Sequence, residues 1–341
     1  MIRLVRMMDE RPIIGVTAGD PAGVGPEIVA RAMADRGLHQ KARLLVLGTA
    51  SIMAEAVRLV GVDLALHPVQ HAKDGAFSAG TMDILDLAGA EAEGLQPGVI
   101  QGPAGRAAFQ YVRSAIEMAM SGEIDAIATA PINKESLRAG EVPYLDHTEM
   151  LAKLTGSPSP MTLFVLDNLR IFFLTRHVPL AEACRQVTRA GVLEALQRSD
   201  AELRRLGIQQ PRIAVAGLNP HAGDGGLFGA EDGEQIAPAV ADARALGLDA
   251  YGPIPADSVF FMNRRGRYDA VLALYHDQGH IAAKTVDFER TISVTVGLPF
   301  VRTSVDHGTA FDIAWKGTAS SIGMEEAIAV AARFSPLYRR A

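Results

Sequence analysis

The sequence contains a single cysteine, few aromatic residues and no long apolar run. Because Cys184 stands alone, a disulfide framework within the chain and a zinc site built from thiolates are excluded, so any metal must bind histidines and carboxylates. We expect Cys184 to be a small core residue of a helix. A run of about 18 apolar residues is absent, and residues 1–11 lack the apolar stretch of a secretory signal. We therefore predict a cytoplasmic protein that binds no membrane.

A strong charge of one sign is also missing. The 33 basic and 39 acidic residues leave a formal net charge of -6, and no basic block marks a nucleic-acid partner. Hydrophobic residues make up 48% of the chain, which excludes a disordered protein, and 341 residues suffice for about two domains. The 33 glycines, with 6% aromatics, are typical of α/β enzymes, whose strands and helices are joined by tight turns.

Short apolar runs alternate along the chain with longer segments of helical periodicity. This alternation predicts an α/β fold with mostly parallel sheets and helices on both faces. Residues 68–103 are the least regular and could hold a loop and short strands. One predicted helix begins at Pro26. The other predicted helices cover residues 104–121, 180–207, 232–246 and 322–334. The predicted strands are Pro12–Thr17, Leu44–Leu47, Ala126–Thr129, Ile171–Leu174, Ile213–Ala216, Ala270–Leu274 and Ile292–Val296.

A glycine-rich turn, GDPAGVGPE (Gly19–Glu27), joins the first predicted strand to the first helix. Glycines there permit positive φ angles and a close backbone approach to a ligand, and the following helix N-terminus favours an anion. The run lacks the G-x-G-x-x-G spacing of a dinucleotide-binding loop. A tight structural turn and a binding loop therefore both remain open.

Three histidines, His177, His221 and His276, each follow a predicted strand, in LRIFFLTRH, AVAGLNPHAGDGG and AVLALYHDQGH. In parallel α/β sheets, ligands bind beyond the carboxyl ends of the strands. Three neutral imidazoles suit a catalytic divalent ion and leave positions open for substrate oxygens. Nitrogen ligands favour zinc, with cobalt, nickel or manganese as further candidates. A single histidine at a strand end is more often structural, so placement alone supports both interpretations about equally.

A second candidate binding segment is RTSVDHGTAFDIAWKG, which begins at Arg302. Here Asp312 follows the small-residue turn that contains Gly308. A carboxylate in this setting can accept the two hydroxyls of a ribose and would repel a 2′-phosphate, which favours NAD over NADP. The alternative is that Asp306 or Asp312 caps a helix.

Taken together, these segments resemble the 4-hydroxythreonine-4-phosphate dehydrogenase (PdxA) family. The resemblance runs along nearly the whole chain, and it is closer to the branch of 4-phospho-D-threonate and 4-phospho-D-erythronate dehydrogenases, through DNLRIFFLTRH, YHDQGHIAAKT and DFERTI. A more distant resemblance links GDPAGVGPE and HGTAFDIAWKG to isopropylmalate and isocitrate dehydrogenases. The motifs that carry the family resemblance are, in order, GDPAGVGPEI, LDHTEM, TRHVPL, GLNPHAGDGG, PADSVF, YHDQGH and GLPFVRTSVDHGTAFDIA.

This resemblance implies a two-domain α/β/α fold of the isocitrate/isopropylmalate dehydrogenase type. Residues 1–130 and 298–341 would form a discontinuous first domain with the nucleotide-binding loops. Residues 131–297 would form a second domain that carries the metal histidines and the dimer contacts. The resemblance further implies a homodimer with shared active sites in the interdomain cleft.

The family's site residues carry over position by position. Its metal ligands match the three histidines above, for one divalent ion per site: zinc, or else magnesium, cobalt, manganese or nickel. The candidate cofactor-binding residues are Gly308 and Asp312 of the segment described above. Two departures, Ser293 where the family commonly has asparagine and Asp146 where it commonly has glycine, put the substrate in question. The substrate-binding positions are His147, Thr148, Lys284, Ser293 and Arg302, of which Lys284 is also the candidate catalytic residue.

The implied reaction is the NAD-dependent oxidation of the C3 hydroxyl of a 4-phosphorylated four-carbon acid, followed by β-decarboxylation. We expect 4-phospho-D-threonate or 4-phospho-D-erythronate as substrate, giving dihydroxyacetone phosphate and CO2. The alternative is 4-phosphohydroxy-L-threonine, oxidised in pyridoxine and pyridoxal phosphate biosynthesis. Alternatives of a different class are a metal-dependent hydrolase or acyl transferase, and a non-catalytic phosphometabolite binder. From the residues alone, Lys284 and Arg302 would be a solvated lysine and a surface salt bridge.

Overall fold

The computed structural model describes residues 9–87 and 94–338 of the chain. They form two compact units, and the chain passes through the first unit twice. Of the described residues, unit 1 comprises 9–87, 94–154 and His307–Pro336, and unit 2 comprises Thr155–Asp306 with residues 337 and 338. The sequence-based division has its boundaries after residues 130 and 297. No helix among the described residues is long and apolar enough to cross a membrane.

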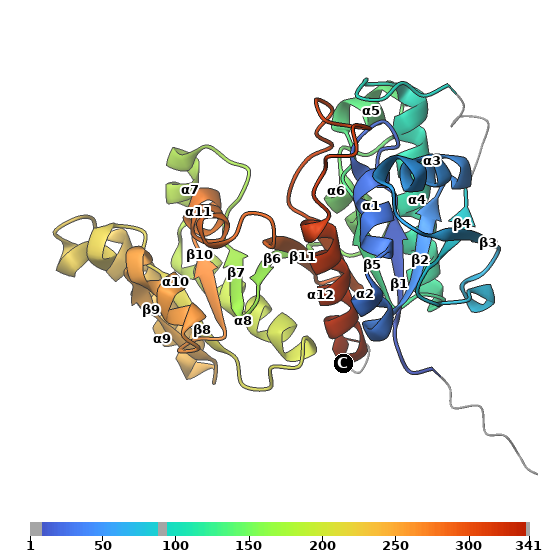
Figure 1. The fold of residues 1–341 in the computed structure, drawn as a ribbon. Helices are drawn as coiled ribbons and strands as arrows, with labels where there is room; N and C mark the ends of the chain where they lie inside the picture. The colour runs from blue at the N-terminus through green and yellow to red at the C-terminus, as the bar shows by residue number, and fades with distance from the viewer. Residues whose placement is uncertain (1–8, 88–93, 339–341) are drawn as a thin grey trace, which may run out of the picture. The chain divides into compact units, whose positions relative to one another are not determined.

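The sheet of unit 1 is parallel, with strand order β3-β4-β2-β1-β5 (Figure 1). The strands are β1 (Ile13–Thr17), β2 (Arg43–Gly48), β3 (Ala65–Val69), β4 (Thr81–Asp86) and β5 (Ala126–Thr129). The helical segments are α1 (Gly25–Met33), α2 (Arg36–Lys41), α3 (Ala50–Val60), η1 (Ala72–Asp74), α4 (Gly102–Ser121), α5 (Lys134–Ala139), α6 (His147–Thr155) and α12 (Ile322–Tyr338).

Local sequence explains the main elements of unit 1. β1 and β2 are buried apolar runs, as central parallel strands must be because helices cover their faces. The long helix α4 packs on these two strands. It ends at Gly122, whose φ of 77° is the left-handed conformation that closes a helix at little cost for glycine. The described part of the irregular region 68–103 holds strand β4 and the end of β3, while residues 88–93 of that region lie outside the described residues.

The sheet of unit 2 is mixed, with strand order β12-β11-β6-β7-β10-β8-β9. β7, β10, β8 and β9 run parallel to one another, whereas β6 pairs antiparallel with both β7 and β11, and β11 pairs antiparallel with β12. The strands are β6 (Met161–Leu166), β7 (Leu169–Phe173), β8 (Arg212–Ala216), β9 (Asp249–Ile254), β10 (Ala270–Ala273), β11 (Ile292–Val296) and β12 (Val301–Val305). The helical segments are α7 (Leu180–Gln186), α8 (Arg189–Arg205), η3 (Pro220–Gly226), η4 (Asp232–Ile236), α9 (Ala237–Ala245), α10 (Ala256–Arg264) and α11 (His276–Val286).

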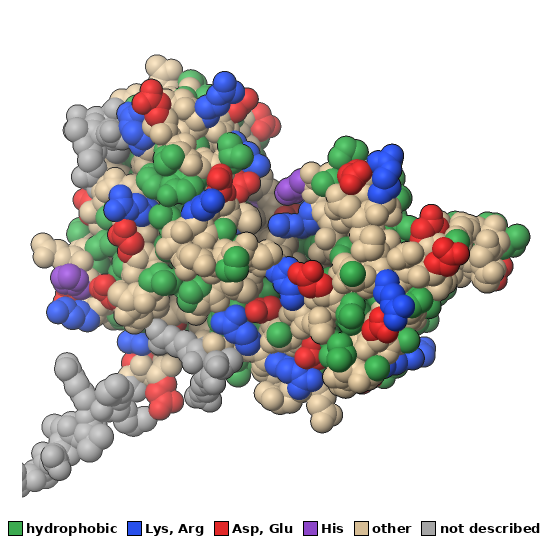
Figure 2. All heavy atoms as spheres, turned by 180° about the vertical axis from the view of Figure 1, so that it is seen from behind, with side chains coloured by type: hydrophobic (Ala, Val, Ile, Leu, Met, Phe, Trp, Pro, Cys, Tyr) green, Lys and Arg blue, Asp and Glu red, His purple; other side chains and the backbone are tan. Residues whose placement is uncertain are grey.

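Two predicted helices of unit 2 are divided in the structure. The segment 180–207 breaks into α7 and α8 because Thr188 is extended and its side chain accepts a hydrogen bond from the Gly191 N–H, which starts a new helix. The segment 232–246 opens with a π-helical turn, η4, before α9 begins. Cys184 lies in α7, as predicted, but it is only partly buried, so its assignment to the core is wrong. On the surface shown in Figure 2, basic and acidic side chains are interspersed, which reflects the nearly balanced composition.

Candidate functional site

The three histidine-bearing loops leave the sheet of unit 2 from adjacent strands. β7, β10 and β8 are consecutive and parallel, so their carboxyl ends share one edge of the sheet. His177 follows β7, His276 begins α11 directly after β10, and His221 lies in η3 after β8. The fold therefore places all three loops where parallel sheets bind their ligands.

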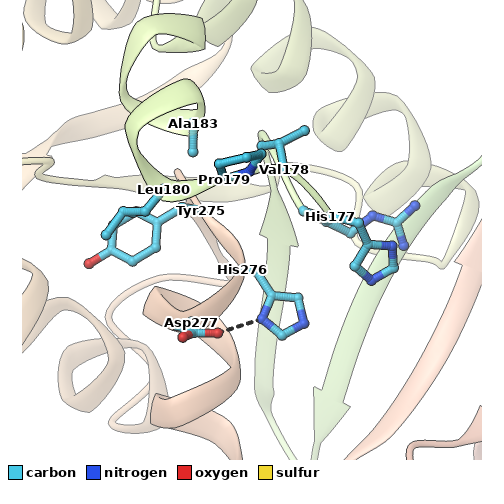
Figure 3. A pocket seen from close by; sticks show the side chains of 9 residues that line it. His177, Val178, Pro179, Leu180, Ala183, Tyr275, His276 and Asp277 are labelled. Carbon is cyan, nitrogen blue, oxygen red and sulfur yellow. Dashed lines mark hydrogen bonds and ion pairs between the residues drawn. The ribbon is translucent and has the colours of Figure 1, made fainter.

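Two of the three imidazoles come together at this edge. The ring centroids of His177 and His276 are 5.7 Å apart, and both line a pocket of about 430 Å³ (Figure 3). His276 Nδ1 lies 2.6 Å from an Asp277 carboxylate oxygen, and Figure 3 shows this contact. A carboxylate on one ring nitrogen orients the imidazole and directs its other nitrogen, Nε2, to a ligand.

His221 takes a different environment. Its backbone has φ 54°, the left-handed region that a residue with a side chain rarely adopts. Its ring faces Phe228 with a centroid distance of 6.3 Å, and it does not line the pocket of the other two histidines. Across residues 9–87 and 94–338, no group of three His, Cys, Asp or Glu side chains is close enough to hold a metal. The chain thus pairs two of the predicted ligands and leaves the third on the neighbouring loop.

The His221 loop is anchored by a buried carboxylate. Asp232 is 1% exposed, and its two oxygens accept hydrogen bonds from the N–H groups of Leu218 and Asn219 at 2.9 and 3.0 Å. The amide of Asn219 donates a third bond at 3.0 Å. Asp232 therefore fixes the backbone that leads into His221.

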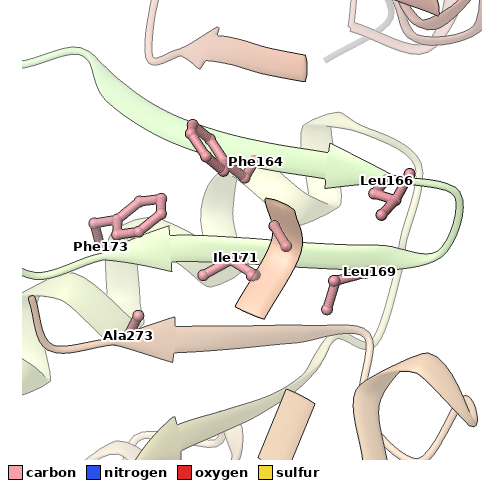
Figure 4. Packing of buried hydrophobic residues seen from close by; sticks show 7 residues of the cluster. Phe164, Leu166, Leu169, Ile171, Phe173 and Ala273 are labelled. Carbon is pink, nitrogen blue, oxygen red and sulfur yellow. The ribbon is translucent and has the colours of Figure 1, made fainter. Parts of the chain in front are cut away.

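One residue of this edge, His280, was missed by the sequence analysis. It lies one helical turn after His276 on α11, and the two rings stack at 3.5 Å. On its other side it packs against Phe164 and Phe173, which belong to the apolar cluster in Figure 4. Burial lowers the pKa of His280 to about 4, so the ring is neutral at physiological pH. The i, i+4 spacing in YHDQGH is the signal that could have identified it.

The next turn of the same helix face carries Lys284. Its Nζ lies 2.6 Å from an Asp306 carboxylate oxygen and donates to the Asp306 carbonyl at 3.2 Å. The ring of Phe288 lies 4.9 Å from the same nitrogen. Lys284 is therefore a partly buried, ion-paired side chain and not the solvated lysine of the structural alternative. Asp306, considered in the sequence only as a helix cap, holds it in place.

Ser293 and Arg302 share one face of an antiparallel strand pair. In the register of β11 and β12, Ser293 is opposite Ser304 and Thr295 is opposite Arg302, and residues two apart in a strand point to the same side. Arg302 is 5% exposed and donates to Thr295 Oγ1 at 3.2 Å. A guanidinium this deeply buried is not a surface salt bridge, and it is suited to hold an anion with two parallel hydrogen bonds.

The remaining predicted residues belong to unit 1. His147 and Thr148 begin α6, while Gly308 and Asp312 are exposed on the segment that returns to this unit. Asp146 accepts a hydrogen bond from the Glu149 N–H at 3.1 Å and lies 3.4 Å from Lys134 Nζ. Burial acts to raise the pKa of Asp146, but that hydrogen bond and the Lys134 charge outweigh it, so the pKa is lowered. The Asp146 carboxylate thus already interacts with groups of its own unit.

Comparison with known proteins shows close relatives over nearly the whole chain. Residues 40–331 match the family described as "Pyridoxal phosphate biosynthetic protein PdxA". A Symbiobacterium thermophilum protein named "Putative D-threonate 4-phosphate dehydrogenase" is 53% identical, covering 98% of this chain and 99% of the relative. A protein of the same name from Clostridium botulinum (strain Langeland) is 50% identical, covering 98% and 100%. The crystal structure of a 4-hydroxythreonine-4-phosphate dehydrogenase from Klebsiella pneumoniae superposes with a TM-score of 0.90 at 41% identity, covering 96% and 99%.

These comparisons confirm the predicted α/β fold and the predicted family. They confirm an oxidoreductase, and membership implies a nicotinamide dinucleotide, NAD or NADP, as its cofactor. Hence the chain belongs to the PdxA family of dehydrogenases.

Proposed function

We propose that this enzyme oxidises the C3 hydroxyl of 4-phospho-D-threonate or 4-phospho-D-erythronate with NAD, and that loss of CO2 then gives dihydroxyacetone phosphate. The observation that carries the proposal is the 53% identity, over 98% of the chain, to a relative named for D-threonate 4-phosphate. The alternative substrate, 4-phosphohydroxy-L-threonine, is supported by the names of solved structures at 41% to 43% identity.

The surroundings of Asp146 reduce the attraction that its carboxylate offers to the amine of 4-phosphohydroxy-L-threonine. The two candidate substrates differ at C2, where one carries an amine and the other a hydroxyl. An additional carboxylate beside His147 would attract a cationic amine only if its charge were available. Since Lys134 and the first turn of α6 already engage Asp146, it adds little attraction for an amine.

Two imidazoles at the edge of unit 2, those of His177 and His276, support a divalent metal site there. The 5.7 Å separation of the His177 and His276 rings, and the Asp277 contact that leaves His276 Nε2 for a ligand, match two imidazole ligands of one ion. His221, which lies outside their pocket on the neighbouring loop, would have to approach this pair to supply the third ligand, and zinc is the ion that such nitrogens suit best. When bound, NAD would supply the hydride acceptor for C3, and the divalent ion would stabilise the negative charge on the C3 oxygen.

The chain's own side chains perform the other tasks. Arg302, buried and fixed by Thr295, holds an anionic group of the substrate with two hydrogen bonds. Ser293 lies on the same face and can hydrogen-bond a substrate hydroxyl. Lys284, fixed against Asp306, holds the proton that carbon C2 takes up after CO2 has left. His147 and Thr148 contribute further substrate contacts from unit 1. The Asp312 carboxylate would accept hydrogen bonds from the ribose hydroxyls of NAD.

We further propose that the enzyme is a homodimer in the cytoplasm. Two apolar side chains of α10 and α11, Phe261 and Ile281, are 62% and 64% exposed and line one cavity of about 630 Å³. Exposed apolar groups that gather in this way mark an interaction surface. Sedimentation equilibrium tests the proposal: the wild type should sediment as a dimer and Phe261→Asp as a monomer, whereas a monomeric wild type would refute it.

The substrate assignment is tested by measuring kcat/KM for 4-phospho-D-threonate, 4-phospho-D-erythronate and 4-phosphohydroxy-L-threonine with NAD under identical conditions. We expect a phosphorylated hydroxy acid to be preferred. Turnover that needs a metal but no NAD would instead support a hydrolase or acyl transferase.

A further inference from the structure

Helix α1 holds the segment that carries Asp312 through a buried carboxylate. Glu27, in the first turn of α1, has no exposed surface. One of its oxygens accepts a hydrogen bond from the Trp315 N–H, and the other accepts from the Gly317 N–H at 2.7 Å. Arg31, one turn later on the same helix, donates to the Gly317 carbonyl at 2.6 Å. The helix thus binds both polar groups of the Gly317 backbone.

The glycine-rich turn before α1 holds the other end of that segment. The Val24 N–H donates to the Thr309 carbonyl at 3.0 Å. A Cβ atom at Gly23 would lie 2.9 Å from the Thr309 Cβ and 3.0 Å from its carbonyl oxygen, so this approach requires glycine. The indole N–H of Trp315 adds a bond to the Pro21 carbonyl at 2.9 Å.

The segment between these contacts has no regular structure that would fix it alone. Ala310 and Trp315 have φ angles of 42° and 59°, a conformation that costs free energy in residues with a side chain. Surrounding contacts must impose such a conformation. Asp312 lies between them with its side chain exposed.

We propose that Glu27 is a positioning residue for dinucleotide binding. The turn GDPAGVGPE holds the segment Thr309–Gly317 in place through these hydrogen bonds, here called the clasp, so that Asp312 faces the ribose. This inference rests on the proposed function, which assigns Asp312 to NAD. The inference decides between the two interpretations of the glycine-rich turn. Gly23 allows the turn to pack closely on a protein segment, and the Glu27 carboxylate accepts hydrogen bonds from backbone N–H groups of that segment. In this account, the turn acts on the cofactor through Asp312 and not as a phosphate-binding loop.

Trp315 is the only tryptophan of the chain, which provides a direct probe of the clasp. In the cofactor-free protein, Glu27→Ala should shift the Trp315 emission and speed hydrogen exchange at the Trp315 and Gly317 amides. Energy transfer from Trp315 to NADH reports cofactor binding, and its Kd should rise about tenfold in Glu27→Ala. At saturating NAD, kcat should stay within about twofold. Glu27→Gln, which keeps one acceptor oxygen, should recover part of the loss.

A matched control separates positioning from general stability. Asp83 is another buried carboxylate of unit 1, and it accepts from the N–H groups of Ala76 and Phe77 at 2.9 and 2.7 Å. Asp83→Ala should lower the melting temperature without changing the Kd for NADH. If Glu27→Ala does not fold, Arg31→Met, which removes the bond to the Gly317 carbonyl, serves in its place and should raise the Kd by about threefold.

The outcomes that overturn the inference are specific. A folded Glu27→Ala protein, or its Arg31→Met substitute, that binds NADH as the wild type does overturns this inference alone. An equal loss of NADH affinity in Asp83→Ala also overturns it, because the effect is then general destabilisation. A wild type that does not bind NADH contradicts the proposed function itself, and the inference with it.

Discussion

Lys284 Nζ lies 2.6 Å from a carboxylate oxygen of Asp306, and this pair joins helix α11 to the end of strand β12. The same face of α11 carries His276 and His280, each one turn apart. The helix therefore aligns a candidate metal ligand, a neutral imidazole and a fixed ammonium group.

The Lys284–Asp306 pair should matter for turnover more than for substrate binding. We expect Lys284→Met to lower kcat by about 100-fold, because proton transfer by a positioned side chain contributes at least that much. Asp306→Ala should lower kcat by about tenfold, since the ammonium remains but is no longer held in place. Steady-state kinetics at saturating substrate measures both. Lys153→Met, which removes an exposed lysine of α6, is the control and should be neutral; full activity in Lys284→Met would exclude its catalytic role.

Metal binding should depend on the paired histidines. After exhaustive dialysis against chelator and reloading with zinc, the wild type should retain a stoichiometric amount of metal by elemental analysis. His177→Ala and His276→Ala should retain little, and each should lose at least about 100-fold in kcat. His71→Ala, which removes an exposed histidine of unit 1, should behave as the wild type. Unchanged metal content and activity in His276→Ala would rule out the site.

Asp20 should make stability depend on pH in a defined window. Burial raises its pKa to about 6, against the opposing hydrogen bond from the Ala22 N–H, whereas the unfolded chain has an ordinary aspartate with a pKa of about 3.9. Between about pH 4 and 6 the folded state therefore binds the extra proton, so the free energy of unfolding falls as the pH rises, by up to about 3 kcal/mol. Asp20→Asn lacks this contribution. Its stability relative to the wild type should increase from pH 4 to pH 7, as measured by urea unfolding; parallel curves would contradict the assignment.

Asp146 should affect stability but not the choice of substrate. Asp146→Ala removes the hydrogen bond to the Glu149 N–H at the start of α6, which should cost about 1 kcal/mol. Because Lys134 already engages its charge, the ratio of kcat/KM for the hydroxy and amino acid substrates should change by less than about threefold. A tenfold shift in that ratio would show that Asp146 selects the substrate.

Local sequence signals predicted the elements that local forces determine. The apolar run before the glycine-rich turn is β1, and the amphipathic segment 104–121 is α4, because burial of one face decides both. Strands β6, β9 and β12 were not predicted. The β9 segment contains Gly252 and Pro253, which weaken a strand pattern, and its pairing with β8 compensates for them.

The part of the site that lies at the ends of buried strands could be predicted from the sequence. The positions of His177, His221 and His276 after buried strands placed them at one sheet edge, as the structure shows. The partners that hold the site were not visible in the same way. Asp306 meets Lys284 across 22 residues and Glu27 meets Gly317 across 290, and no local pattern encodes contacts between segments so far apart. That only two of the three predicted metal ligands come together among the described residues is likewise determined by tertiary structure.

The central claim is tested most directly by assaying the purified enzyme with each substrate separately, in the presence of zinc and NAD, and measuring the rate of NADH formation. The account predicts that 4-phospho-D-threonate or 4-phospho-D-erythronate is turned over with a kcat/KM at least about tenfold above that of 4-phosphohydroxy-L-threonine, and that dihydroxyacetone phosphate accumulates in step with NADH. Preference for 4-phosphohydroxy-L-threonine by the same margin, or NADH formation without dihydroxyacetone phosphate, would contradict it.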